Sequence, residues 1–292
     1  MPSTIEIQEE SRPQGGPLSV LYKYLTAFEK LNGRNVIIYY SGFLNTETNT
    51  SIQDEDMNGF MAAIYKMDKT KGLDLFLHTP GGLVSATEGI GNYLRSVFKG
   101  DINCYVPHMA MSCGTLLAMA CKKIFMGKHS CLGPIDPALG QYRADAVIEE
   151  FENARNDINK NPNLSLLWQP ILSKYPITFL GECEKAKQLA ENVSRKWLEE
   201  GMLKGDKYAQ KKIDAIVSVF ASHKNSKLHD RHIPEEEAEK VGLKAGLIED
   251  NPVLQDAVMS VHHAAMNYIR KENYARIISN VKGLGLFVKA QK

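Results

Sequence analysis

A serine and a pair of glycines stand where the sequence changes from strand-like to helix-like runs. The stretch VPHMAMSCGTLL (residues 106–117) has Ser112 at such a junction. A hydroxyl residue followed by small residues and an apolar helical run is typical of a turn that exposes a nucleophile at a helix N-terminus. Upstream, LHTPGG (residues 77–82) forms a second junction, whose bare backbone N–H groups are suited to a developing oxyanion. Together the two junctions predict an acyl-transfer site with Ser112 as nucleophile.

Each of these residues also has a simpler interpretation. Gly81 and Gly82 fit a tight turn before a helix, and Ser112 fits a helix N-cap. Cys113, at a helix N-terminus, is either a second nucleophile or a small packing residue, and packing is favoured. His108 lies near the expected cleft and is a supporting candidate, although such histidines are more often structural. The catalytic interpretation depends on the two junctions occurring together.

Alternating strand and helix patterns surround these junctions. Short apolar, β-branched runs predict strands, and apolar residues at helical spacing predict the helices between them. The expected strands cover residues 35–40, 73–77 and 102–106, and the expected helices cover residues 18–31, 54–66, 83–98 and 112–120. Such alternation predicts an α/β fold of parallel strands with right-handed crossovers, with the ligand site at the carboxyl ends of the strands.

The rest of the chain predicts a single domain with flexible ends. Residues 1–17 mix Glu, Ser, Pro and Gly and predict a flexible arm. Residues 18–271 form the domain, with its core at 35–143 and a helical layer at 144–271; residues 272–292 form a solvated basic tail. For the amphipathic helices 18–31 and 252–270, core packing is favoured, and subunit contacts are the alternative.

Composition excludes several classes of protein. The 292 residues carry a formal net charge of +1, which argues against a nucleic-acid partner. No apolar run is long enough to predict a transmembrane segment, and the N-terminus lacks the pattern of a signal peptide. The odd number of cysteines, without CxxC spacing, predicts neither disulfides nor a zinc site and favours the cytoplasm. Metals and cofactors are not expected, since the histidines do not form an HExxH motif.

Three motifs in this order resemble the serine dehydrogenase proteinase family, a branch of the ClpP-class serine peptidases alongside signal peptide peptidase A. They are LHTPGG (77–82), VPHMAMS (106–112) and LGPIDP (132–137). A looser resemblance continues through Glu184-Lys185-Ala186 and His229-Asp230, so that it covers roughly residues 35–250.

The resemblance implies a ClpP/crotonase-like spiral of ββα units that assembles into a homo-oligomer. It also implies an endopeptidase that cleaves peptides or proteins through an acyl-enzyme on Ser112. The backbone N–H groups of Gly82 and Cys113 would then form the oxyanion hole, beside Gly81. Loss of one such donor typically costs about 3 kcal/mol of transition-state stabilisation.

The general base departs from ClpP itself. The histidine that serves as base in ClpP corresponds to Ile135 or Asp136 in this chain, and neither is a histidine. Because the signal peptide peptidase branch uses a lysine, we expect a Ser-Lys dyad with Lys185 as base and Lys174 as the second candidate. A lysine acts as a base only when burial lowers its pKa, and Leu189 and Val193 are expected to bury Lys185.

Two other functions remain open alongside the peptidase. One is a crotonase-like acyl-CoA enzyme, which also uses paired backbone amides, although no acidic pair is evident beside the cleft motifs. The other is a non-catalytic assembly module that keeps the fold and binds a partner.

Overall fold

Alternating apolar side chains bury both faces of the central sheet. In β1 (Asn35–Ser41), Ile37 and Tyr39 belong to one hydrophobic cluster, whereas Ile38 and Tyr40 belong to the cluster on the other face. Strands that are buried on both sides are typical of parallel sheets, which need helices to cover each face. The predicted α/β class is therefore built on a two-sided core.

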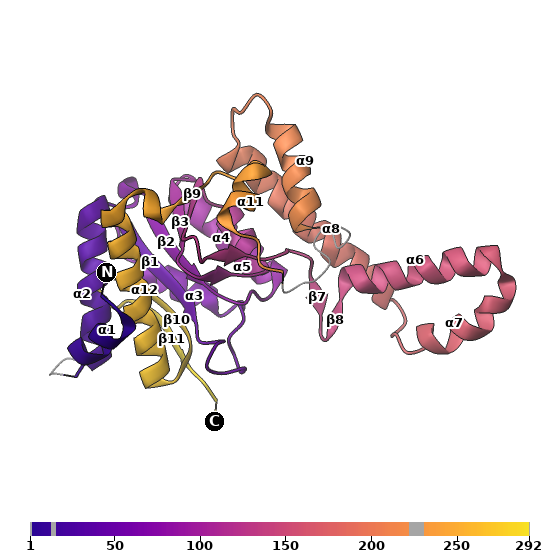
Figure 1. Cartoon of the computed structure of the whole chain (residues 1–292), viewed down its shortest axis with the longest axis horizontal. Helices are drawn as coiled ribbons and strands as arrows, with labels where there is room; N and C mark the ends of the chain where they lie inside the picture. The colour runs from indigo at the N-terminus through magenta and orange to yellow at the C-terminus, as the bar shows by residue number, and fades with distance from the viewer. Residues whose placement is uncertain (1, 13–15, 222–230, 292) are drawn as a thin grey trace.

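The computed structural model describes residues 2–12, 16–221 and 231–291, and Figure 1 shows its elements. The seven-stranded sheet has the order β11-β10-β1-β2-β3-β5-β9. The strands from β1 to β9 run parallel, and β10 and β11 add an antiparallel edge. Besides β1, the strands are β2 (Leu73–His78), β3 (Ile102–Val106), β5 (Lys123–Met126), β9 (Ala245–Leu247), β10 (Tyr274–Asn280) and β11 (Gly285–Lys289).

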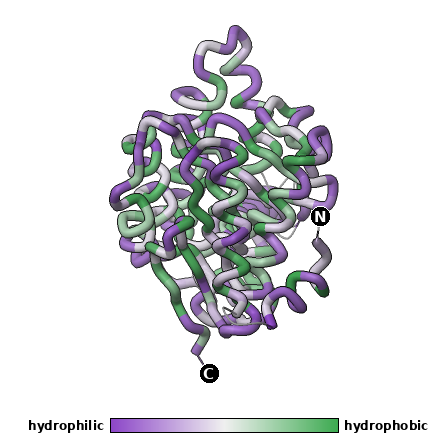
Figure 2. Tube along the Cα trace, turned by 90° about the vertical axis from the view of Figure 1, so that its left-hand side faces the viewer, coloured by the Kyte–Doolittle hydropathy of each residue, from purple (hydrophilic) through white to green (hydrophobic). Residues whose placement is uncertain are grey.

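Helices cover the two faces of this sheet. One face packs against α3 (Asp56–Ile64), α4 (Val84–Val97), α5 (Cys113–Met119), α9 (Ala209–Phe220) and α11 (Glu235–Lys240). The other packs against α1 (Thr4–Glu10), α2 (Gly16–Asn32) and α12 (Pro252–Glu272). Figure 2 views the molecule from the side of α2 and α12, and apolar and hydrophilic stretches alternate along the trace. The strands and helices expected between residues 18 and 120 are all present, with ends shifted by a few residues.

Both ends of the chain are more ordered than the sequence predicted. Within the expected flexible arm, α1 begins with a capping box at Ser3 and Glu6, and Ile7 is fully buried. The expected solvated tail at 272–292 is wrong, because β10 pairs with β1 and β11 pairs with β10. Its alternating apolar residues, including Ile277 and Ile278, complete both clusters of the core. The His229-Asp230 pair lies outside the described residues.

Part of the expected helical layer is instead an arm. The hairpin of β7 (Ala138–Leu139) and β8 (Tyr142–Arg143) leads into α6 (Ala144–Lys160), and α7 (Ser165–Leu172) follows. In Figure 1 these helices project away from the sheet, and α8 (Phe179–Trp197) leads back to it. The arm has only a small apolar cluster of its own, which includes Phe179 and Cys183. The prediction of a layer over the core is wrong here, because amphipathic periodicity does not specify which surface a helix packs on.

A buried ion pair joins the last part of the chain to the N-terminus of α3. Arg276 of β10 is 1% exposed, and its Nε donates to Asp56 Oδ1 at 2.9 Å. The Tyr39 hydroxyl donates to the other carboxylate oxygen at 2.9 Å, and the Gln53 N–H donates to it as well. Arg276 also donates to the Asn49 carbonyl oxygen. The loop between β1 and α3 is therefore anchored on both sides of its turn by one guanidinium.

Replacing this guanidinium tests the anchor. Arg276→Met would leave Asp56 buried without its cation, so we expect the free energy of unfolding to fall by about 3–5 kcal/mol. Urea denaturation would measure it, with Arg270→Met on the exposed end of α12 as the matched control. A loss as small as that of the control would contradict the anchoring role.

Three histidine rings contact one another between the sheet and α12. His78 at the end of β2 lies 5.4 Å from the ring of His108 and 5.6 Å from that of His262. Neither nitrogen of His78 has a hydrogen-bond partner among the described residues. Burial and the neighbouring His108 lower the pKa of His78 from 6.5 to about 3, and burial with His78 and His263 lowers the pKa of His262 well below its usual value. These rings are therefore neutral in the folded protein.

Neutral buried histidines make stability depend on pH. Because the pKa of His78 is lower in the folded chain, its contribution is fully present above about pH 6.5 and is lost as pH falls toward 3. We expect one such histidine to cost about 2 kcal/mol between pH 7.5 and pH 5, as measured by urea denaturation. His78→Phe should flatten this dependence, whereas His232→Gln on the surface should not. An unchanged slope in His78→Phe would refute the assignment.

Candidate active site

Two backbone hydrogen bonds join the strand-helix junctions that the sequence singled out. The Thr79 N–H donates to the Met109 carbonyl oxygen at 3.0 Å, and the Met111 N–H donates to the Thr79 carbonyl oxygen at 3.0 Å. Thr79 follows β2, and β4 (Met109–Ala110) precedes α5. The junctions are therefore neighbours at the carboxyl edge of the sheet, as expected for a parallel fold.

Gly81 brings the first junction directly against the second. Its φ of 107° is unfavourable for other residues, and a Cβ there would lie 2.7 Å from the Cβ of Ser112. The same Cβ would lie 3.1 Å from the Cys113 nitrogen. A glycine is thus required for the close approach of the two turns, and a tight turn alone does not explain it.

Ser112 has a strained backbone and a side chain that does not cap α5. Its φ of 50° and ψ of −119° are rare for a residue with a Cβ and typically cost about 1–3 kcal/mol. Although it precedes α5, its side chain makes no capping hydrogen bond. The interpretation of Ser112 as a helix N-cap therefore fails, and the strained turn instead resembles that of an exposed nucleophile.

Two backbone amides beside Ser112 are not used by the fold. Cys113 is the first residue of α5, so its N–H has no acceptor within the helix. On either side of Gly82, the Ile52 N–H donates to the Gly81 carbonyl oxygen at 2.7 Å, and the Leu83 N–H donates to the Ile52 carbonyl oxygen at 3.0 Å. These two hydrogen bonds leave the Gly82 N–H unused. Neither the Gly82 nor the Cys113 N–H donates to a backbone carbonyl in the described part of the chain. Both N–H groups are thus available to donate hydrogen bonds to an anionic oxygen.

The Cys113 side chain is a packing group. It is 3% exposed, and its thiol donates to the Gly82 carbonyl oxygen at 3.0 Å. Burial raises the pKa of the Cys113 thiol, so the thiolate that nucleophilic chemistry needs is disfavoured. The favoured interpretation of Cys113 as a small packing residue is the one that fits.

A cavity of about 580 Å³ opens beside Ser112. One wall is the Pro80–Gly82 turn, and the other is the loop at residues 51–55, which the bridge from Ile52 to Gly82 holds in place. Asp54 and Glu55 on this loop are carboxylates that the sequence analysis missed. The polar loop carried no motif, and only the Ile52 bridge brings it to the site.

Among the described residues that line the cavity there is no lysine or histidine to serve as general base. The described lining instead carries the carboxylates of Asp54 and Glu55. His108 contacts the rings of His78 and His262 instead. Ile135 is buried in the core, and Asp136 accepts two hydrogen bonds from Arg143, so neither replaces the histidine of ClpP.

The two candidate lysines both lie on the arm. Lys185 on α8 and Lys174 after α7 are exposed. The expected burial of Lys185 is wrong for the single chain, because Leu189 is itself 37% exposed and only Val193 packs in the core. The half of α8 that carries Lys185 packs on α6, away from the sheet.

Neither a metal-binding cluster nor a membrane-spanning helix is found in the described ranges. No group of three or more His, Cys, Asp or Glu side chains there has an arrangement that would hold a metal ion. Likewise, no helix in those ranges is long and apolar enough to cross a membrane.

Two uncharacterized proteins of Methanocaldococcus jannaschii are similar to this chain. The first is 33% identical over 189 residues, which make up 65% of this chain and 58% of the relative. The second is 28% identical over 240 residues, which make up 79% of this chain and 74% of the relative.

Among solved structures, a mutant of 1510-N, a membrane-bound stomatin-specific protease, aligns with 15% identity and a TM-score of 0.40 over 82% of this chain and 88% of its own. Residues 39–246 match the family described as ClpP-like SDH-type serine proteinase. This match covers the three motifs and runs from within β1 to within β9. The chain therefore belongs to the family of ClpP-like SDH-type serine proteinases and has its ClpP-like α/β fold.

Proposed function

We propose that this protein is a serine endopeptidase whose nucleophile is Ser112. The observation that carries the proposal is the strained backbone of Ser112, whose hydroxyl is not used as a cap and lies at a cavity beside two free amides. In the reaction, Ser112 Oγ attacks the peptide carbonyl carbon and its proton passes to a base. The N–H groups of Gly82 and Cys113 stabilise the oxyanion. The amine leaves with a proton, and water then hydrolyses the acyl-enzyme.

We propose Lys185 as the base, with Lys174 as the second candidate. An exposed lysine is protonated at neutral pH, so it becomes a base only if a partner surface covers it. The arm that carries both lysines has an uncovered apolar surface, in which Leu166 is 77%, Leu167 61% and Ile177 94% exposed. This surface supports a homo-oligomer in which a second copy covers the arm and completes the Ser-Lys dyad.

A cytoplasmic location is also proposed. All five cysteines are free and buried, which supports a reducing compartment.

The nucleophile is tested with a fluorophosphonate probe and peptide mapping by mass spectrometry. We expect Ser112 to be labelled and Ser112→Ala to lose all labelling, since the probe reacts with an activated serine. Ser51→Ala is the matched control, because Ser51 lines the same cavity and should leave labelling unchanged. Lys185→Met should slow labelling by about 100-fold or more, whereas Lys196→Met on the same helix should not.

Other outcomes would favour the remaining functions. Slow labelling in Lys174→Met, with normal labelling in Lys185→Met, would assign the base to Lys174. Hydrolysis of an acyl-CoA without labelling of Ser112 would favour the crotonase-like enzyme, for which Asp54 and Glu55 supply the acidic pair. Neither activity in the assembled protein would favour a non-catalytic assembly module.

The acidic wall predicts a preference for basic substrates. Asp54 and Glu55 are exposed at the cavity, and Glu55 already lies 3.3 Å from the Arg276 guanidinium, so their attraction for a cationic side chain is modest. We expect Asp54→Asn with Glu55→Gln to lower kcat/KM about two- to fivefold for a lysine-containing peptide and to leave a neutral peptide unaffected. Glu47→Gln, on the same loop but outside the cavity, serves as control. An equal loss for both peptides would rule out a role in selectivity.

A further inference from the structure

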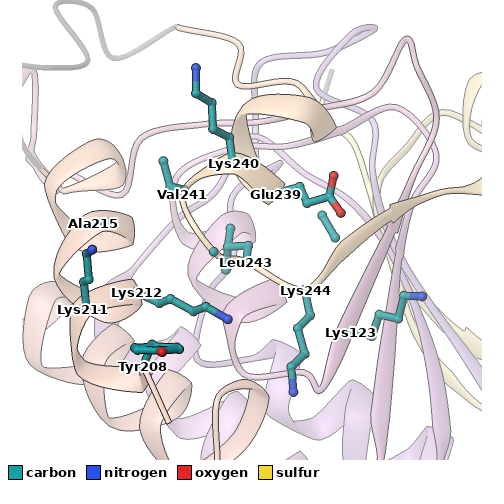
Figure 3. Close-up of a pocket in the computed structure, with 12 residues that line it drawn as sticks. Lys123, Tyr208, Lys211, Lys212, Ala215, Glu239, Lys240, Val241, Leu243 and Lys244 are labelled. Carbon is teal, nitrogen blue, oxygen red and sulfur yellow. The ribbon is translucent and has the colours of Figure 1, made fainter. Parts of the chain in front are cut away.

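A second and larger cavity, of about 770 Å³, lies at the opposite edge of the sheet (Figure 3). Lys123 at the start of β5 lines one part of it, and Lys244 and Ala245, where the chain enters β9, line another. Helices α9 and α11 supply the remaining walls. Because Ser112 follows the carboxyl ends of the strands and this cavity adjoins their amino ends, the two sites are separate.

Positive charge is concentrated in this cavity. Among the described residues, its lining carries one carboxylate, Glu239, and five lysines: Lys123, Lys211, Lys212, Lys240 and Lys244. Of these lysines, only Lys212 has a carboxylate partner in the described part of the chain, Asp206 at 2.6 Å. For a chain with a formal net charge of +1, this is a strong local excess of cations. Such a cluster favours a ligand with several negative charges.

An aromatic and apolar surface faces the same space. Tyr208 is 60% exposed, and Figure 3 shows its ring below the side chain of Lys212, with Leu243 on the other side of that side chain. The Lys207 amine lies 5.7 Å from the centre of the Tyr208 ring and adds a further cation beside it. Val241 and Ala215 extend this apolar part of the lining. An exposed aromatic ring is suited to stacking on a flat ring system. The cavity thus combines an apolar surface, which suits an uncharged planar ring system, with lysine amines, which suit an anionic group.

Lys212 is held in position for such a ligand. A Cβ on Gly242, whose φ is 109°, would lie 2.9 Å from the Cβ and Cγ of Lys212. The glycine therefore leaves room for the lysine stem to cross the loop before β9. Asp206 holds the amine at its end, and an ammonium group with one partner keeps further N–H donors.

A smaller basic pocket near Arg34 lacks this combination. Its volume is about 400 Å³, and Arg34 is already bound to Asp74 and Asp101. The charge there is used to tie α2 to the sheet, whereas four lysines of the larger cavity have no such partner among the described residues.

We propose that the larger cavity binds a nucleoside phosphate, with its ring on Tyr208 and its phosphates on Lys212 and Lys244. The volume lies within the range of small-molecule sites, about 300–1,000 Å³. Lysine amines bind phosphate oxygens as charge-assisted hydrogen bonds. The site does not involve the Ser112 chemistry, so it would make the protein responsive to a nucleotide independently of the nucleophile.

Isothermal titration calorimetry of the full chain with ATP, AMP and inorganic triphosphate tests this site. We expect ATP to bind. We also expect the double substitution Lys212→Ala with Lys244→Ala to lower the affinity for ATP and for triphosphate by about tenfold or more. Lys160→Ala with Lys271→Ala removes two exposed lysines outside the cavity and should have no effect. Tyr208→Ala should lower the affinity for ATP but not the affinity for triphosphate. The Ser112→Ala variant should bind ATP with the same affinity as the unmodified chain.

Three results would overturn the proposal. They are no binding of ATP, equal weakening by the two lysine pairs, and an unchanged ATP affinity in Tyr208→Ala. Loss of fluorophosphonate labelling with normal ATP binding would instead concern the proposed peptidase function alone.

Discussion

The hydrogen bonds of Thr79 with Met109 and Met111 are the constraint on which the candidate site depends. Parallel strands bring the ends of β2 and β3 to the same edge, but the loops that follow are free to diverge. Because Thr79 continues the pairing past the strands, Gly81 lies against Ser112 and the Gly82 and Cys113 amides come to the same cavity. A strained serine persists only where its surroundings fix it, and these bonds fix it.

The last strands of the chain support the opposite wall of the cavity. Arg276 of β10 binds Asp56 and Asn49, which flank the loop at residues 51–55. The wall that carries Asp54 and Glu55 is therefore held by a residue from the other end of the sequence. A buried charge of this kind is stable only when its partners are present, which ties the shape of the cavity to the completion of the sheet.

The proposed function would make assembly a condition for catalysis. In it, Ser112 and two backbone amides form one half of the site, and no lysine or histidine is among the described residues of the cavity. The candidate lysines and the most exposed large apolar side chains, including Leu166 and Ile177, lie on the same projecting helices and turns. Covering that surface would both remove apolar area from water and lower the pKa of a lysine, since burial disfavours its charged form.

Local patterns in the sequence were sufficient for the elements from β1 to α5 and for Ser112 and the glycine pair. Their periodicity, turn residues and junctions all lie within short stretches, and connections between neighbouring elements are short. The resemblance to the family rested on the same stretches and was confirmed by the family match.

Contacts between distant residues decided the rest. The edge strand β10 is defined by pairing with β1, the 51–55 wall by its bridge to Gly82, and the exposure of Lys185 by the direction in which the arm leaves the sheet. None of these has a local signal, because a run of residues has the same periodicity whether or not a distant partner covers it. The sequence by itself therefore determined the junction that carries Ser112. Only the tertiary structure decided which walls surround this junction and that neither candidate lysine lines the cavity.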